Sequence, residues 1–299
     1  MHTIDRRAFL ATSATALGAA ALLRPSLGAA TAATAKATVG FRIFAPDWTL
    51  DKRCDPAAYE LAARIGLDGV QVDFGWPPEG GGRPPLFAEA KQNELMASAA
   101  RHGVAISSLA LGAVNRTPYK SSAEGEQWAL DAIAVLRRMK LRVVLLPFFN
   151  KGDLIGDPAG LEEVIRRLRR LAPRAEEAGV IFGIESWLKV PELERIMDAV
   201  KSPAVQVYYD IGNMQKVDEN VGAAIRQLGR ERICEVHLKD YDDLYGKGSM
   251  DFPAVRAALD AIHYRGWVGI EGTKTPLGVE QSIRYDLDYL RPLFPRKIG

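Results

Sequence analysis

The sequence feature that most constrains the fold of this 299-residue chain is a regular alternation of short apolar runs with longer amphipathic stretches. From residue 36 onward, eight runs rich in β-branched residues have the length of β-strands, and a stretch with helical periodicity follows each of them. Strands that alternate with helices form parallel sheets. Eight such units in about 250 residues predict a single closed (β/α)8 TIM barrel, because open doubly wound sheets usually have fewer strands. The expected strands are residues 39–44, 69–74, 104–109, 142–147, 180–185, 205–210, 233–239 and 267–271.

Alternation of polarity within the runs supports closure into a barrel. In the seventh run Glu235, His237 and Lys239 share one face, and Cys234 lies on the other. Alternate side chains of a barrel strand point to the interior and to the surrounding helices. We therefore expect the polar set to face the barrel axis and Cys234 to face the helices. The same parity places Gln71 of the second run inside the barrel.

Four side chains with metal-binding chemistry fall at the carboxyl ends of four consecutive expected strands: Glu185, Asp210, His237 and Glu271. Their spacings of 25, 27 and 34 residues each match one strand-helix unit. Because barrel enzymes carry their chemistry at this rim, the four are expected to be neighbours there. Three carboxylates and one imidazole predict a site for one divalent metal, with manganese, magnesium or cobalt favoured and zinc less suited. The alternative at each position is structural, as a helix cap or a hydrogen-bonded core histidine.

Motifs around these residues resemble those of the xylose isomerase-like barrels. The motifs are Gly-Ile-Glu at 183–185, Tyr-Asp-Ile-Gly-Asn at 209–213, Val-His-Leu-Lys-Asp at 236–240, Gly-Lys-Gly-Ser-Met-Asp-Phe at 246–252 and Gly-Ile-Glu at 269–271. This family of sugar phosphate isomerases and epimerases includes ketose 3-epimerases and inosose isomerases and dehydratases, and the resemblance covers residues 39–290. It implies that Glu185, Asp210, His237 and Glu271 bind the metal and that the two glutamates also transfer protons. Asn213 stands where many of these epimerases carry a histidine, which implies a role for this position in orienting the substrate.

The paired glutamates suit an isomerisation. Moving a proton next to a carbonyl requires a base on one face, an acid on another and a cation that holds the oxygens. Glu185 and Glu271 come from the fifth and eighth expected strands, so they face each other across part of the mouth. Lys239 could add positive charge beside the developing oxyanion. A salt bridge from Lys239 to Asp240 or Glu235 is the equally open alternative.

Loops at the same rim carry five large aromatic residues, namely Trp48, Trp76, Phe148, Phe149 and Trp187. Aromatic rings stack on the C–H faces of sugars, although in loops they more often pack the loop down. One or two of them, Trp187 among the candidates, are expected to contact a small-molecule carbohydrate. The glycine- and proline-rich loop 75–85 is the candidate lid, with a disordered loop tip as the alternative.

The first 35 residues read as a twin-arginine signal peptide. Residues 5–10 are Asp-Arg-Arg-Ala-Phe-Leu, and a weakly apolar stretch and several small residues follow. The domains are therefore a signal over residues 1–35 and a barrel over residues 36–299, with a periplasmic or extracellular destination and no membrane span after signal removal. Without residues 1–35 the formal net charge falls from +2 to 0, which disfavours nucleic acid as a partner. The sequence leaves the oligomeric state open.

Alternative functions remain at the same site. A lyase or dehydratase would use the same proton abstraction on a 3-keto sugar or an inosose to expel a leaving group. A non-catalytic sugar-binding barrel should lack a complete acid-base pair. An abasic-site endonuclease would need a histidine-rich cluster of three zinc ions, whereas only three histidines follow residue 35. The substrate is expected to be unphosphorylated, because the chain carries an export signal and lacks a glycine-rich phosphate cradle.

Overall fold

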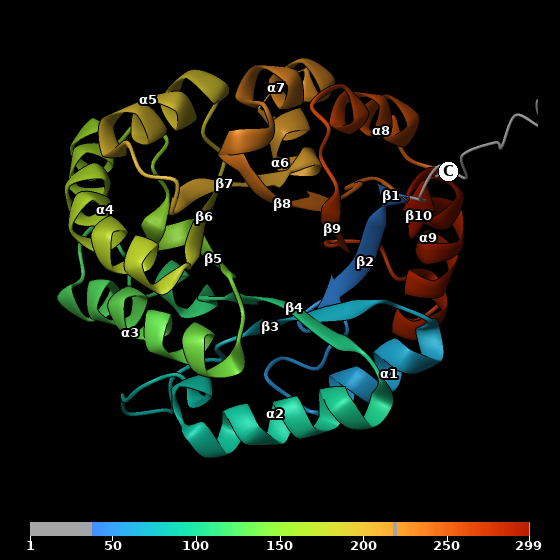
Figure 1. Ribbon diagram of the computed structural model, residues 1–299, viewed down its shortest axis with the longest axis horizontal. Helices are drawn as coiled ribbons and strands as arrows, with labels where there is room; N and C mark the ends of the chain where they lie inside the picture. The colour runs from blue at the N-terminus through green and yellow to red at the C-terminus, as the bar shows by residue number, and fades with distance from the viewer. Residues whose placement is uncertain (1–37, 218–219, 299) are drawn as a thin grey trace, which may run out of the picture. The chain divides into compact units, whose positions relative to one another are not determined.

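The computed structural model describes residues 38–217 and 220–298, and its central feature is a closed barrel of parallel strands (Figure 1). Neighbouring strands follow chain order, and the last pairs with the first. The eight strands are β2 (Phe41–Pro46), β3 (Gly69–Asp73), β4 (Ala105–Ala110), β5 (Val143–Phe148), β6 (Ile181–Ser186), β7 (Val205–Asp210), β8 (Ile233–Leu238) and β9 (Gly266–Ile270). This confirms the predicted single TIM barrel, and every strand begins within two residues of its expected position. The predicted signal over residues 1–35 lies outside the described residues.

Helices surround the barrel and cover the outer faces of its strands (Figure 1). They are α1 (Ala57–Ile65), α2 (Glu89–His102), α3 (Ala123–Met139), α4 (Pro158–Ala178), α5 (Val190–Val200), α6 (Ile211–Lys216), α7 (Val221–Leu228), α8 (Phe252–Ala261) and α9 (Val279–Leu293). A short antiparallel pair, β1 (Thr38–Val39) and β10 (Lys297–Ile298), joins the two ends of the described chain. No helix in the described ranges combines the length and apolarity needed to cross a membrane.

Local sequence signals set the ends of the longest helix, α4. The Asp157 side chain caps its start by accepting a hydrogen bond from the backbone N–H of Gly160, and Pro158 occupies the first turn. Gly179 ends the helix with a φ of 66°, a left-handed conformation that glycine adopts at little cost. The chain then enters β6 at Ile181, so these signals help to deliver Glu185 to the rim.

The short helix α6 was not predicted, and it begins directly at the end of β7. The Asp210 side chain caps it, because Oδ1 accepts a hydrogen bond of 2.9 Å from the backbone N–H of Asn213. One residue thus serves both the rim and the helix cap. The helix-cap role considered for strand-end carboxylates is therefore correct for Oδ1 of Asp210. The other oxygen, Oδ2, faces the site.

The expectation that Cys234 faces the helices was wrong. Pairing between β7 and β8 shifts by one residue, so that Val207 is opposite Ile233 and Tyr208 is opposite Glu235. Cys234 is the extra residue of this irregularity, and one extra residue reverses the face to which a side chain points. Its sulfur packs with the inner barrel cluster that includes Tyr208, and a Cβ added to Gly183 would lie only 2.6 Å from Sγ.

Candidate active site

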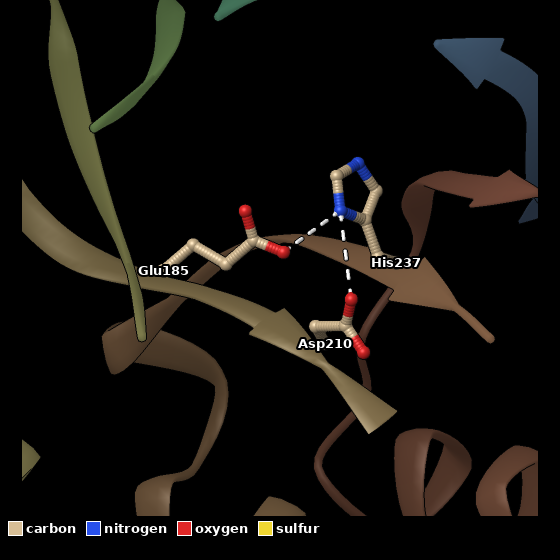
Figure 2. A group of neighbouring side chains, drawn as sticks. All are labelled: Glu185, Asp210 and His237. Carbon is tan, nitrogen blue, oxygen red and sulfur yellow. Dashed lines mark hydrogen bonds and ion pairs between the residues drawn. The ribbon is translucent and has the colours of Figure 1, made fainter. Parts of the chain in front are cut away.

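Strands β6, β7 and β8 bring three of the predicted ligands together at the carboxyl end of the barrel. One ligand atom from each of Glu185, Asp210 and His237 lies within 4.8 Å of the others (Figure 2). His237 Nδ1 is 3.2 Å from Glu185 Oε1 and 3.9 Å from Asp210 Oδ2. All three residues are buried, so the cluster forms a polar floor beneath the rim.

The fourth predicted ligand, Glu271, follows β9 and lies outside this close group. Its Oε1 accepts a hydrogen bond of 3.1 Å from Trp48 Nε1, and its Oε2 forms an ion pair with Lys239. Lys239 Nζ also lies 2.7 Å from Asp210 Oδ2. The ammonium group therefore joins Glu271 to the cluster. The salt bridge considered from sequence, to Asp240 or Glu235, is replaced by one to Asp210 and Glu271.

Two glycines make room for the buried stem of Lys239. A Cβ on Gly212 would lie 2.8 Å from Lys239 Cγ, and a Cβ on Gly272 would lie 2.6 Å from Cε. Gly272 has a φ of 63°, which also disfavours any other residue there. The Lys239 side chain thus lies in a narrow passage between Gly212 and Gly272, where larger residues would clash with it. Along this passage its ammonium group reaches the carboxylates.

Burial and mutual charge shift the ionisation of the cluster. Burial raises the pKa of Glu185 and of Asp210 to about 7, against the lowering effect of the Lys239 ammonium. For Glu271 burial acts in the raising direction, but the charges of Lys239 and of protonated His237 outweigh it and lower the pKa to about 2. Burial lowers the pKa of His237 to about 4, so its imidazole is neutral at neutral pH.

This donor set fits a divalent metal ion. A neutral imidazole offers a nitrogen lone pair, and the carboxylates offer hard oxygen ligands. Buried carboxylates that lie this close repel one another, and a cation among them relieves both the repulsion and the cost of burial. The residues Glu185, Asp210 and His237 therefore suit a divalent metal ion, with Glu271 at the edge of the group.

A cavity of about 430 Å³ opens above the cluster, and Glu185, Lys239 and Glu271 are among the residues that line it. This volume falls at the lower end of the range for small-molecule sites, roughly 300–1,000 Å³. Of the five rim aromatics considered from sequence, four line the cavity: Trp48, Trp76, Phe149 and Trp187. Phe148 instead packs edge-on against buried Tyr119, away from the cavity. The loop 75–85 contributes Trp76, and its role as a lid stays a prediction.

Asn213 and Trp187, the two predicted substrate contacts, are linked to each other and to the site. Asn213 Oδ1 accepts hydrogen bonds of 3.2 Å from Trp187 Nε1 and 2.6 Å from the Tyr241 hydroxyl. Asn213 Nδ2 donates to Glu185 Oε1 over 3.4 Å. Both residues line the cavity, but Asn213 is buried and its amide is occupied by these partners. Its visible role is to hold Glu185 and Trp187 in position.

Sequence reasoning missed several contacts in the site. Gln71 Oε1 lies 2.9 Å from His237 Nε2, and the Arg53 guanidinium pairs with Asp73 at 2.7 Å beside the cavity. Strand parity placed Gln71 inside the barrel, but it could not name a partner on a strand 166 residues away. The Trp48 bond to Glu271 links residues 223 positions apart and was equally hidden.

Comparison with known proteins finds named epimerases among the similar sequences. A protein of Escherichia coli (strain K12) provisionally named L-ribulose-5-phosphate 3-epimerase is 26% identical over 244 residues, which cover 72% of this chain and 82% of that protein. The 2-epi-5-epi-valiolone 7-phosphate 2-epimerase of an Actinoplanes species is 27% identical over 186 residues, which cover 62% of this chain and 67% of that protein.

Solved structures show the same fold. The D-psicose 3-epimerase of Clostridium cellulolyticum H10, crystallised with D-tagatose, superposes with a TM-score of 0.70 at 16% identity, and the match covers 84% of this chain and 99% of that one. The family model described as "Xylose isomerase-like TIM barrel" matches residues 59–293, which span most of the barrel. The chain therefore belongs to the xylose isomerase-like TIM barrel family.

Proposed function

We propose that this chain is a sugar epimerase or isomerase that moves a proton next to a carbonyl group and depends on one divalent metal ion. The observation that carries the proposal is that two acidic side chains, Glu185 and Glu271, line one cavity beside the neutral imidazole of His237. The named relatives, which are sugar epimerases, support the same enzyme class.

Glu185, Asp210 and His237 would hold the metal, with Glu271 completing the set. When bound, a divalent ion polarises a carbonyl and stabilises negative charge on neighbouring oxygens, which acidifies the adjacent C–H group. The protein atoms for this are present in one buried cluster, and the donor chemistry suits the ion.

The two glutamates divide the proton transfer between them. One carboxylate removes the proton from the carbon next to the carbonyl, and the other returns a proton to the opposite face in an epimerisation. Lys239 contributes a fixed positive charge at the cavity, where negative charge develops on the substrate oxygen. The rings of Trp48, Trp76 and Trp187 line the cavity and offer apolar surface to the C–H groups of a sugar.

A substrate screen tests this function. The full chain, freed of metal and reloaded with Mn²⁺, is incubated with unphosphorylated ketoses and 3-keto sugars, and the products are identified by NMR and mass spectrometry. The expected product is an isomer of unchanged mass. A product that has lost water or an aglycone would assign the same site to a lyase. Sugar binding without turnover of any compound would point to a binding protein.

Phosphate selectivity gives a further prediction. We expect kcat/KM for a free ketose to exceed that of its phosphate ester at least about tenfold, or about 1.4 kcal/mol. The physical reason is that the Arg53 guanidinium at the cavity is already paired with the Asp73 carboxylate at 2.7 Å. Parallel assays of one sugar in both forms measure the ratio. Both relatives compared above are named for phosphorylated substrates, so a preference for the ester would overturn this expectation.

A further inference from the structure

A chain of buried hydrogen bonds runs from the candidate metal site into the barrel interior. It starts at His237 Nε2, which lies 2.9 Å from Gln71 Oε1. Gln71 Nε2 donates to Ser108 Oγ over 3.2 Å and to the Tyr208 hydroxyl over 2.8 Å. Both hydroxyl groups then donate to the same oxygen, Glu235 Oε2, over 2.7 and 2.8 Å. None of the five residues is more than 3% exposed.

The acceptor at the far end fixes the direction of every bond in this chain. A hydroxyl group has one proton. Because Ser108 and Tyr208 each donate theirs to Glu235, both must accept their hydrogen bond from Gln71. The amide NH₂ of Gln71 therefore points to the hydroxyls, and its carbonyl oxygen points to the histidine. A carbonyl oxygen can only accept, so His237 must donate from Nε2. Oε2 of Glu235 can accept both bonds whether or not the other carboxyl oxygen carries a proton.

A neutral imidazole carries one N–H, so a proton on Nε2 leaves Nδ1 with its lone pair. Nδ1 is the nitrogen that lies 3.2 Å from Glu185 Oε1 and 3.9 Å from Asp210 Oδ2. The lone pair of Nδ1 therefore points at carboxylate oxygens, and acceptors that face one another repel. A cation bound between them makes this arrangement favourable. If the Gln71 amide were flipped, so that its oxygen and nitrogen exchanged places, its NH₂ group would face Nε2. The imidazole proton would then lie on Nδ1, where it prevents that nitrogen from binding a metal.

We propose that Glu235, acting through Gln71 with Ser108 and Tyr208, is a positioning residue that holds His237 in the tautomer with its proton on Nε2 and so keeps Nδ1 free to bind the metal. This inference rests on the metal site proposed above. The outer partners of metal-bound histidines commonly set ring orientation and tautomer, and their loss typically weakens metal binding about 10–100-fold.

The position of Glu235, at the far end of these hydrogen bonds, favours this assignment. Glu235 lines a separate cavity of about 550 Å³ at the amino-terminal end of the barrel, between the first residues of several strands. It therefore lies on the side of His237 away from the sugar cavity and is not among the residues that line that cavity. Its hydrogen bonds reach His237 through Ser108, Tyr208 and Gln71.

The test compares two substitutions of Glu235 in the full chain. Glu235→Leu removes the acceptor, whereas Glu235→Gln keeps one oxygen that accepts both hydroxyls. Glu231→Leu is the matched control, because Glu231 is exposed and lines the same cavity at the amino-terminal end of the barrel but takes no part in these hydrogen bonds. The readouts are Mn²⁺ affinity by calorimetry and, in metal-free protein, the ¹⁵N shifts of the His237 ring, assigned by their loss in His237→Gln.

We expect Glu235→Leu to weaken Mn²⁺ binding about 10–100-fold and to reduce the population of the Nε2–H tautomer. Glu235→Gln and Glu231→Leu should retain both properties close to those of the unmodified protein. Should Glu235→Leu fail to fold, Tyr208→Phe, which removes one of the two hydroxyls, is expected to shift both readouts in the same direction by less. A folded Glu235→Leu protein with unchanged tautomer and affinity would overturn the proposal. If the unmodified chain binds no Mn²⁺, the metal site is wrong, and the tautomer readout still decides whether Glu235 orients His237.

Discussion

Replacing Glu185 or Glu271 with glutamine is expected to lower kcat by about 10²–10⁴-fold, the usual cost of losing a general acid or base. Glutamine keeps the size and one oxygen ligand of the side chain but cannot carry a proton. Partial metal binding should survive in both variants. In an epimerase each variant should still exchange the substrate proton on one face with solvent while failing to invert the carbon.

Deuterium exchange and net conversion, measured separately, check this expectation. Glu177→Gln, an exposed glutamate on α4, is the control and should leave both rates unchanged. If Glu185→Gln and Glu271→Gln both turned over near the rate of the unmodified protein, the two carboxylates would be structural ligands only. The proton-transfer mechanism would then be wrong, whatever metal the protein holds.

The second large effect is expected at His237. His237→Ala removes the nitrogen ligand of the cluster and leaves Glu185 and Asp210 close together, so Mn²⁺ affinity should fall more than the roughly 100-fold typical of losing an outer partner. Calorimetric titration of metal-free protein measures this loss. His102→Ala, at the end of α2, is the control because His102 lies outside the site. Full metal occupancy in His237→Ala would remove the assignment of the ligand set.

Removing metal should also lower thermal stability. Any ligand that binds the folded state alone stabilises it in proportion to the logarithm of its concentration over Kd. Mn²⁺ is therefore expected to raise the Tm of the unmodified chain and to leave that of His237→Ala nearly unchanged. The difference reports binding without reliance on turnover.

The barrel could be predicted from sequence because its signals are local and repeated. Eight β-branched runs with helical stretches between them admit few topologies, and period-two polarity indicates which side of each strand faces inward. The exception, Cys234, shows the limit of that argument. One extra residue in the pairing of β7 with β8 turns the Cys234 side chain to the opposite face of the strand, and nothing in the neighbouring residues indicates this shift.

The site could be predicted only in part. Strand ends brought Glu185, Asp210 and His237 to one rim, because carboxyl ends of parallel strands share an edge. The ion pairs of Lys239 with Asp210 and Glu271 depend on the passage between Gly212 and Gly272, which is visible only in three dimensions.

The interior hydrogen bonds were hidden for a related reason. The bond between Gln71 and His237 joins β3 to β8 across the barrel, and the Ser108 bond to Glu235 joins β4 to β8. Such contacts depend on the tilt and register of strands that are not neighbours in the sheet. Sequence parity can place each side chain inside the barrel, but the choice of partner requires the closed structure.

We propose that the cluster of Glu185, Asp210 and His237, with Glu271, performs metal-dependent proton transfer on a sugar. The most direct measurement is conversion of the substrate found in the screen, carried out in D₂O with Mn²⁺-loaded full-length chain and followed by NMR and mass spectrometry. We expect one solvent deuterium to enter at the carbon whose configuration or oxidation state changes, and removal of the metal to stop both exchange and conversion. Conversion without deuterium at that carbon, or conversion that persists after complete removal of the metal, would contradict it.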